Sequence, residues 1–156
     1  MRRFEPAVLG YTSLRLGIGM SMLIHGVTRI GNIPAFANQL LSHFAKTWLS
    51  HALIIGFAYV TPPVELLIGI LVVLGLFTRL GLVAGGLWMV PLIFGSTLMA
   101  DYDVVGIQLL YSLIFFMLLR HEALNELSLD RCVREIEPSQ AAGETKSVAS
   151  DGQRKA

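Results

Sequence analysis

The feature that most constrains the fold of this chain is a series of four long apolar runs. A helix needs about 20 mostly apolar residues to cross the hydrocarbon core of a bilayer. Such runs occupy residues about 7–27, 52–77, 80–99 and 104–120, and the last is short at its strict limits. We therefore predict an all-α, polytopic membrane protein folded as a four-helix bundle.

The composition favours this membrane class over a soluble protein with buried core helices. Hydrophobic residues make up 54% of the 156 residues and charged residues only 15%. In an ordinary soluble domain about 45–50% of the residues are apolar and about 25% are charged. This chain therefore has too few polar residues to cover the surface of a soluble protein. The lipid bilayer is thus the partner that the composition predicts, and the net charge of +1 indicates no nucleic-acid partner.

The basic residues predict an orientation with both termini in the cytoplasm (N-in/C-in). Arg2 and Arg3 precede the first run, and Arg79 lies between the second and the third. Lys and Arg are enriched in cytoplasmic loops, so we expect a multi-pass protein of the inner (cytoplasmic) membrane. We predict one transmembrane domain over residues 1–131 and a disordered cytoplasmic tail over 132–156, where the chain is small and polar.

The segment between the first two runs has its own apolar pattern. Phe36, Leu40, Phe44 and Trp48 recur every four residues, with polar residues off that stripe. The pattern predicts an amphipathic helix lying in the outer interface. A helix packed on the end of the bundle is an equal alternative, and either one would roof the outer mouth.

Two charged residues fall inside the predicted spans. Arg15 lies eight residues into the first span, and Glu65 lies twelve residues before the cytoplasmic end of the second. At about 1.5 Å per residue, these positions are about 12 and 18 Å from the cytoplasmic edge. Charges at such depths are costly and usually paired, so we predict an intramembrane ion pair between Arg15 and Glu65. The pair either serves function or only fixes the helix register.

Two adjacent prolines precede Glu65 in the segment "YVTPPVELL". Thr61 is a suitable N-cap, and Pro62 and Pro63 would occupy a first helical turn, where missing N–H groups cost little. We therefore predict a helix break at residues 61–63 that brings Glu65 and some free carbonyl groups into the bundle. A packing kink with an incidental glutamate is the alternative.

Other polar residues lie nearer the outer surface and complete a candidate ligand pocket. His25 ends the first span, Tyr59 lies at a similar height on the second, and Gln108 lies just over one turn inside the fourth. Together with Arg15 and Glu65, they would line a pocket roofed by the first loop.

No metal site and no catalytic residues are predicted. His25 and His121 fall at opposite ends of the bundle, too far apart for one ion, and His43 and His51 have no carboxylate at metal-ligand spacing. Nothing resembles a nucleotide-binding loop or a nucleophile–base pair, so catalysis by this chain alone is not indicated.

Taken in order, these residues resemble the DoxX family of small four-helix membrane proteins. The similarity covers about residues 10–131 and rests on residues 14–30, 62–85 and 106–130. Its elements are Arg15, His25, Gly26, Glu65, Gly69, Gly75, Thr78 and Arg79. Two positions depart from the pattern: Gln108 stands where a Glu is often expected, which removes an ionisable group, and Arg29 stands where a Lys is common.

The resemblance implies a link to membrane quinone chemistry, because some members of the family are subunits of a thiosulfate:quinone oxidoreductase. We therefore expect an integral membrane subunit of a quinone-linked redox system, which binds quinone or presents it to a redox partner protein. Quinone would be its one cofactor. The alternatives are a non-catalytic assembly or stress-adaptation protein and, ranked lower, a small-solute carrier. Small residues such as Gly81 and Gly85 serve packing within one chain or a homo-oligomer.

Overall fold

The computed structural model describes residues 5–131, which are helical with short connections and contain no strand. The predicted disordered tail lies outside these residues. The elements are α1 (Pro6–Ile30), α2 (Ile33–His43), α3 (His51–Leu74), α4 (Thr78–Leu98), α5 (Tyr102–Arg120) and the short 3₁₀ helix η1 (Glu122–Leu124). Four of them, α1, α3, α4 and α5, are long and apolar enough to span a membrane. The predicted all-α class with four spanning helices is confirmed.

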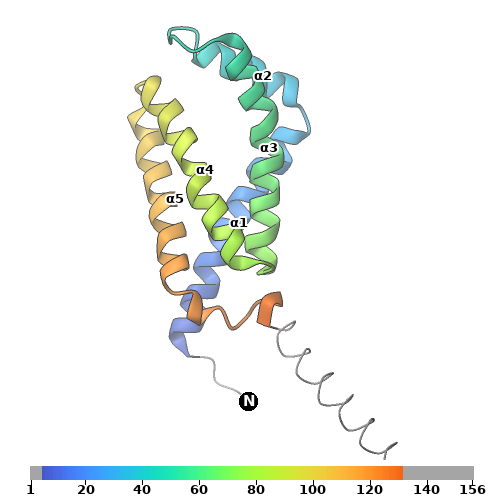
Figure 1. Ribbon diagram of the computed structural model, residues 1–156, viewed down its shortest axis with the longest axis vertical. Helices are drawn as coiled ribbons and strands as arrows, with labels where there is room; N and C mark the ends of the chain where they lie inside the picture. Colours follow the sequence, from blue (N-terminus) through green and yellow to red (C-terminus); the bar gives the residue numbers. More distant parts are fainter. Residues whose placement is uncertain (1–4, 132–156) are drawn as a thin grey trace, which may run out of the picture.

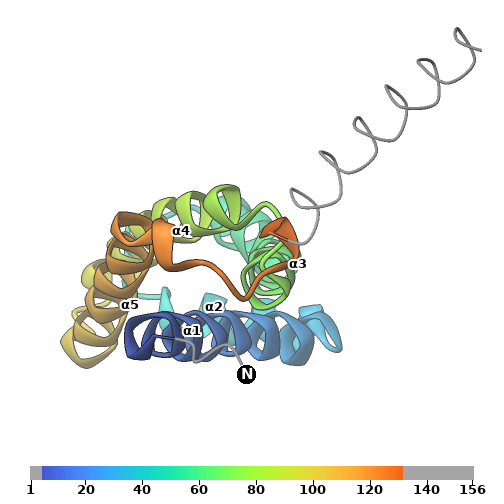
Figure 2. The same ribbon diagram turned by 90° about the horizontal axis from the view of Figure 1, so that it is seen from below.

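The long helices stand side by side with two distinct ends (Figure 1). The terminal end holds the start of α1, the turn between α3 and α4, and residues 121–131. The α2 end holds α2 and the turn between α4 and α5. Figure 1 shows α3 and α4 diverging towards the α2 end. Seen from the terminal end, residues 121–131 run across the bundle from α5 towards α3 (Figure 2).

Three of the helices begin at a side-chain cap from the adjacent residue. Asn32, Ser50 and Asp101 accept hydrogen bonds from the backbone N–H groups at the start of α2, α3 and α5, respectively. Such caps satisfy N–H groups that lack a partner within the helix. The start of α4 has no cap from its own preceding residue.

Glycines set the register between α1 and α3, which are antiparallel. An added Cβ at Gly26 would lie 2.5 Å from the backbone N of Leu66, and one at Gly69 would overlap the backbone of Leu23. Only residues without a side chain permit such close backbone contact. Since Gly26 lies near the end of α1, most of α3 before Leu66 extends beyond α1, where α2 packs against it.

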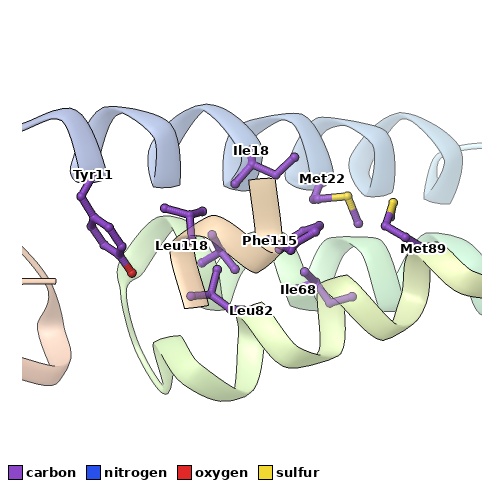
Figure 3. Close-up of a cluster of buried hydrophobic side chains, with 9 residues drawn as sticks. Tyr11, Ile18, Met22, Ile68, Leu82, Met89, Phe115 and Leu118 are labelled. Carbon is purple, nitrogen blue, oxygen red and sulfur yellow. The ribbon is translucent and has the colours of Figure 1, made fainter. Parts of the chain in front are cut away.

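The main hydrophobic core fills the terminal half of the bundle (Figure 3). Its buried residues come from all four long helices: Tyr11, Ile18, Met22, Ile68, Val72, Leu82, Met89, Phe115 and Leu118. The ring of Phe115 occupies the space that a side chain at Gly85 would need, which brings α5 close to α4. In contrast, the outward faces of the helices carry exposed apolar residues, such as Leu109 and Phe116 of α5, as expected for surfaces in contact with lipid.

Candidate functional site

The terminal end is closed by the segment that follows α5. Both carboxylate oxygens of Asp130 accept hydrogen bonds, from the backbone N–H groups of Phe77 and Thr78, each at 2.7 Å. The backbone N–H of Asp130 donates to the carbonyl of Gly75 at 2.9 Å. Asp130 therefore caps α4 from a distant point in the sequence, and its negative charge lies at the positive end of that helix.

Arg15 belongs to this closed end. Its side chain is buried, and its Nη2 donates to the carbonyl oxygen of Leu127 at 2.7 Å. An added Cβ at Gly75 would overlap Nη1 of Arg15, so the guanidinium lies directly against the turn that ends α3. Arg15 thus joins α1 to the segment that caps α4, and the expected pair between Arg15 and Glu65 does not form.

Glu65 instead pairs with Arg29, a residue that the sequence analysis left out of the site. Nη1 of Arg29 donates to both carboxylate oxygens of Glu65. The Glu65 side chain is 4% exposed and that of Arg29 is 30% exposed. The guanidinium of Arg29 also stacks over the ring of Phe36 in α2, 4.9 Å from the ring centroid, a favourable cation–π geometry. A pair of opposite charges therefore lies inside the bundle, held by α1, α2 and α3.

The different pairing follows from the register of α1 and α3. The prediction placed Arg15 and Glu65 at similar depths, on the assumption that both runs enter the membrane at the same level. In the structure Arg15 is level with Gly75, which lies ten residues after Glu65, or about 15 Å along the helix. The same offset brings Arg29, at the end of α1, to the level of Glu65.

The predicted helix break at residues 61–63 does not occur, because α3 is continuous from His51 to Leu74 with Pro62 and Pro63 inside it. The Thr61 hydroxyl does not cap a new segment but donates to the carbonyl of Phe57 at 2.7 Å. Prolines are tolerated in a membrane helix where neighbouring groups pack around them, and Thr61 and Pro62 are fully buried. The prolines still withhold two N–H groups from the preceding turn.

A cavity of about 180 Å³ surrounds the ion pair. We call it the Glu65 cavity. Its polar lining residues are His25, Arg29, Glu65, Gln108 and Tyr111, from α1, α3 and α5. The structure thus gathers three of the predicted pocket residues, His25, Glu65 and Gln108, around one space. Arg15 is absent from the lining because it lies at the terminal end.

Tyr59 also lies away from this cavity. It is 50% exposed on the outward face of α3. Tyr59 and Glu65 are six residues apart, which separates their side chains by about 120° around a helix. Once Glu65 points into the bundle, Tyr59 must point outwards.

A second cavity, of about 250 Å³, continues from the first towards α2. We call it the α2 cavity. Arg29, Leu92, Val104 and Gln108 line both, and His43 of α2 adds a further polar group. The Oε1 atom of Gln108 is buried and has no hydrogen-bond partner among residues 5–131. A buried polar atom of this kind is costly, and its residue lies between the two cavities.

An apolar groove of about 200 Å³ lies between α3 and α4 beside the α2 cavity. All of its lining residues are apolar: Leu40, Phe44, Leu49, Leu53, Ile54, Phe57, Pro91, Phe94 and Gly95. Leu53 is 62% exposed and Phe94 is 52% exposed, so the groove is open at the side of the bundle. The residues that form this opening are themselves apolar.

Arg29 is the site residue that the sequence analysis missed, although two signals point to it. It lies one helical turn after His25, so both side chains share a face of α1. It also occupies a position where the DoxX pattern commonly has another basic residue. The prediction assigned Arg29 to the loop outside the membrane because the first apolar run was judged to end before it.

Comparison with known proteins gives one match. The family model described as DoxX matches residues 10–97, more than half of the chain. This stretch contains most of α1, all of α2 and α3 and nearly all of α4, and so both members of the Arg29–Glu65 pair. No curated protein and no solved structure shows a significant match.

Proposed function

The chain belongs to the DoxX family, and we propose that it binds a quinone in the Glu65 cavity and presents it to a redox partner. The observation that carries this proposal is an ion-paired cavity inside a multi-pass membrane bundle, connected through the α2 cavity to an apolar groove that opens at the side of the bundle. Quinones are apolar molecules with a few polar ring oxygens. The cavity provides polar groups for these oxygens, and the groove provides an apolar surface for the rest of the molecule.

The donors and acceptors of the cavities fit a quinone ring. A ring carbonyl accepts hydrogen bonds, and Arg29, His25 and the amide of Gln108 are donors that line the Glu65 cavity. The buried Oε1 of Gln108 can accept a bond from the hydroxyl of a reduced ring. The two polar cavities, of about 180 and 250 Å³, together reach the lower part of the range of about 300–1,000 Å³ for small-molecule sites.

A bound quinone would supply two-electron redox chemistry, and the protein's residues would orient it and handle its protons. Arg29 holds the Glu65 carboxylate in place, so that one of its oxygens can take up or release a proton beside the ring. The α2 cavity, with Gln39 and His43 in its lining, provides the polar path by which this proton would reach the α2 end.

The electrons would come from a partner protein. Some members of the DoxX family are subunits of a thiosulfate:quinone oxidoreductase, which is the model for this proposal. In the proposed orientation the terminal end lies in the cytoplasm and the α2 end faces outwards across the inner membrane. Arg79 at the start of α4, together with Arg120 and Arg131, lies at the terminal end, which agrees with an excess of positive charge on the cytoplasmic side.

Solvent extraction of the gently purified protein, followed by chromatography for quinones, tests this function. We expect about one quinone per chain in the wild type, and loss of that quinone in a folded Glu65→Gln variant. Glu122→Gln is the matched control, because Glu122 lies at the terminal end and, within residues 5–131, forms its ion pair with the exposed Arg79, at 3.9 Å. Quinone at the lipid background level in all three samples would overturn the proposal and favour an assembly role.

A further inference from the structure

We propose that the ligand of the Glu65 cavity carries a long hydrocarbon tail, which lies in the apolar groove between α3 and α4. The ligand would enter from the side, out of the membrane leaflet nearer the α2 end. This inference rests on the proposed quinone site and adds to it the class of quinone and its path.

The chemistry of the groove selects an apolar chain. Its lining comes from α2, α3, α4 and the loop before α3, and contains no polar side chain. Leu53 and Phe94 form its open side, about 3 and about 6 Å from the α2 end of α3 and of α4 at 1.5 Å per residue. A tail in the surrounding hydrocarbon can therefore move into the groove without crossing a polar surface.

The groove is continuous with the polar cavities, so one molecule can occupy all three spaces. Phe44, Phe57, Pro91 and Gly95 line both the groove and the α2 cavity, and Arg29 and Gln108 connect the α2 cavity to the Glu65 cavity. Polarity thus changes from wholly apolar at the lipid side to charged at Glu65. This gradient matches a polar ring with a hydrocarbon tail.

The charge of the site distinguishes such a ligand from a bilayer phospholipid. Arg29 is already neutralised by Glu65, so the pair carries no net positive charge for a phosphate group. A neutral ring can form hydrogen bonds with the ion pair and does not need an unpaired positive charge. The head group is therefore uncharged, and the tail in the groove belongs to the same molecule.

Gly95 lies at the junction through which the tail must pass. An added Cβ at this position would lie 3.1 Å from Cζ of Phe44, so a large side chain at residue 95 would fill the space between α4 and α2. Gly95 lines the groove and the α2 cavity but not the Glu65 cavity. A substitution there obstructs the tail and leaves the ring site intact.

Trp88 provides a local reporter of binding. Its ring stacks on Phe57, with centroids 5.6 Å apart and planes inclined by 13°, and Phe57 lines both the groove and the α2 cavity. The chain has two tryptophans, and the other, Trp48, is exposed at the α2 end. In a Trp48→Phe background, quenching of the remaining fluorescence reports quinone bound beside Phe57.

The test compares two probes that share one ring, 2,3-dimethoxy-5-methyl-1,4-benzoquinone and its 6-decyl derivative, in nanodiscs. We expect Gly95→Leu to weaken binding of the decyl probe about tenfold and to leave the tail-less probe within about twofold. Gly106→Leu is the control, because a Cβ at Gly106 meets nothing within 4 Å. This control should bind both probes as the parent does.

The outcomes separate this inference from the function on which it rests. Saturable quenching by both probes, with affinities that Gly95→Leu leaves unchanged or lowers equally, would overturn the tail site and leave the ring site standing. The groove would then belong to a lipid acyl chain. Failure of both probes to quench Trp88 in the parent protein would overturn the quinone function itself.

Discussion

The two ends of the bundle use buried polar groups in opposite ways. At the terminal end, Arg15 and Asp130 are turned towards backbone groups of the chain, which link α1, α4 and the segment after α5. From the middle of the bundle towards the α2 end, Arg29, Glu65 and Gln108 line cavities. Hydrogen bonds across helices therefore fasten the terminal end, although Nε and Nη1 of Arg15 have no hydrogen-bond partner among residues 5–131 and Asp130 also lines a cavity of about 470 Å³. The other region differs in placing an ion pair beside its cavities.

The two arginines of α1 show why residue type alone does not reveal a role. Arg15 and Arg29 lie on the same membrane helix, and the sequence analysis predicted only Arg15 as the partner of Glu65. Arg15 is the more deeply buried, yet it contacts the end of α3 and does not line the Glu65 cavity. The burial of a charged side chain alone therefore does not identify a ligand site. The presence of a cavity beside that side chain is the better indication.

The largest expected effect comes from Arg29→Met, which leaves the buried Glu65 carboxylate without its cation. We expect the free energy of unfolding to fall by about 3 kcal/mol, the lower end for broken buried pairs, because Arg29 is partly exposed. Adding Glu65→Gln should restore most of it, as measured by unfolding in detergent micelles.

The control for this prediction uses the other arginine. Arg15→Met should also destabilise the protein, but adding Glu65→Gln should bring no recovery, because Arg15 bonds to Leu127 and not to Glu65. Recovery in the Arg15 series and none in the Arg29 series would reverse the assignment of the two arginines.

Gly75→Ala should give the next largest loss, at the fastened end. Gly75 has φ +64° and an added Cβ would overlap Arg15 Nη1 and crowd Ser128. Backbone strain of this kind costs about 1–3 kcal/mol, and we expect the free energy of unfolding to fall by an amount near the upper end of this range. Thermal unfolding measures it, and Gly56→Ala, where a Cβ meets nothing within 4 Å, should show no loss. Equal melting temperatures for the two variants would contradict the close packing of the terminal end.

Asp130→Ala should have a smaller effect on stability and none on binding. It removes the acceptor for two backbone N–H groups at the start of α4, and loss of such a cap costs about 0.5–2 kcal/mol. The quinone content of the folded fraction should equal that of the wild type. Loss of quinone in folded Asp130→Ala would show that the two ends are not independent.

Tyr111→Phe should give the smallest effect, at the boundary between the two regions. The hydroxyls of Tyr111 and Ser21 share a hydrogen bond of 2.7 Å between α5 and α1, and such bonds between membrane helices contribute about 0.6 kcal/mol on average. In a double-mutant cycle with Ser21→Ala, the coupling should equal that amount. If the stability losses of the two single variants simply add in the double variant, this hydrogen bond does not contribute to the packing of α5 against α1.

Much of the fold could be predicted from the sequence because helix length and apolarity are local properties. The four spans and the helix between the first two follow from such patterns. The relative depth of α1 and α3 could not be predicted in the same way, since it depends on where Gly26 and Gly69 meet the backbone of the opposite helix. That offset decides which arginine reaches Glu65.

The candidate site shows the same division. Glu65, His25 and Gln108 stand out as polar residues in apolar runs, and the structure places them around one cavity. Tyr59 does not join them, because α3 continues unbroken between the two residues and fixes Tyr59 about 120° around the helix from Glu65. The expected break at Pro62 depended on local chemistry that packing around α3 overrides.

The central claim, that the ligand site lies at the α2 end and not at the fastened end, is tested most directly by photoaffinity labelling. An azido-substituted quinone would be photolysed with the protein in nanodiscs, and the labelled peptides would be identified by mass spectrometry. The account predicts label on residues 57–65 or 88–108, which disappears when unlabelled quinone competes. Competed label on residues 11–15 or 122–131 would contradict it.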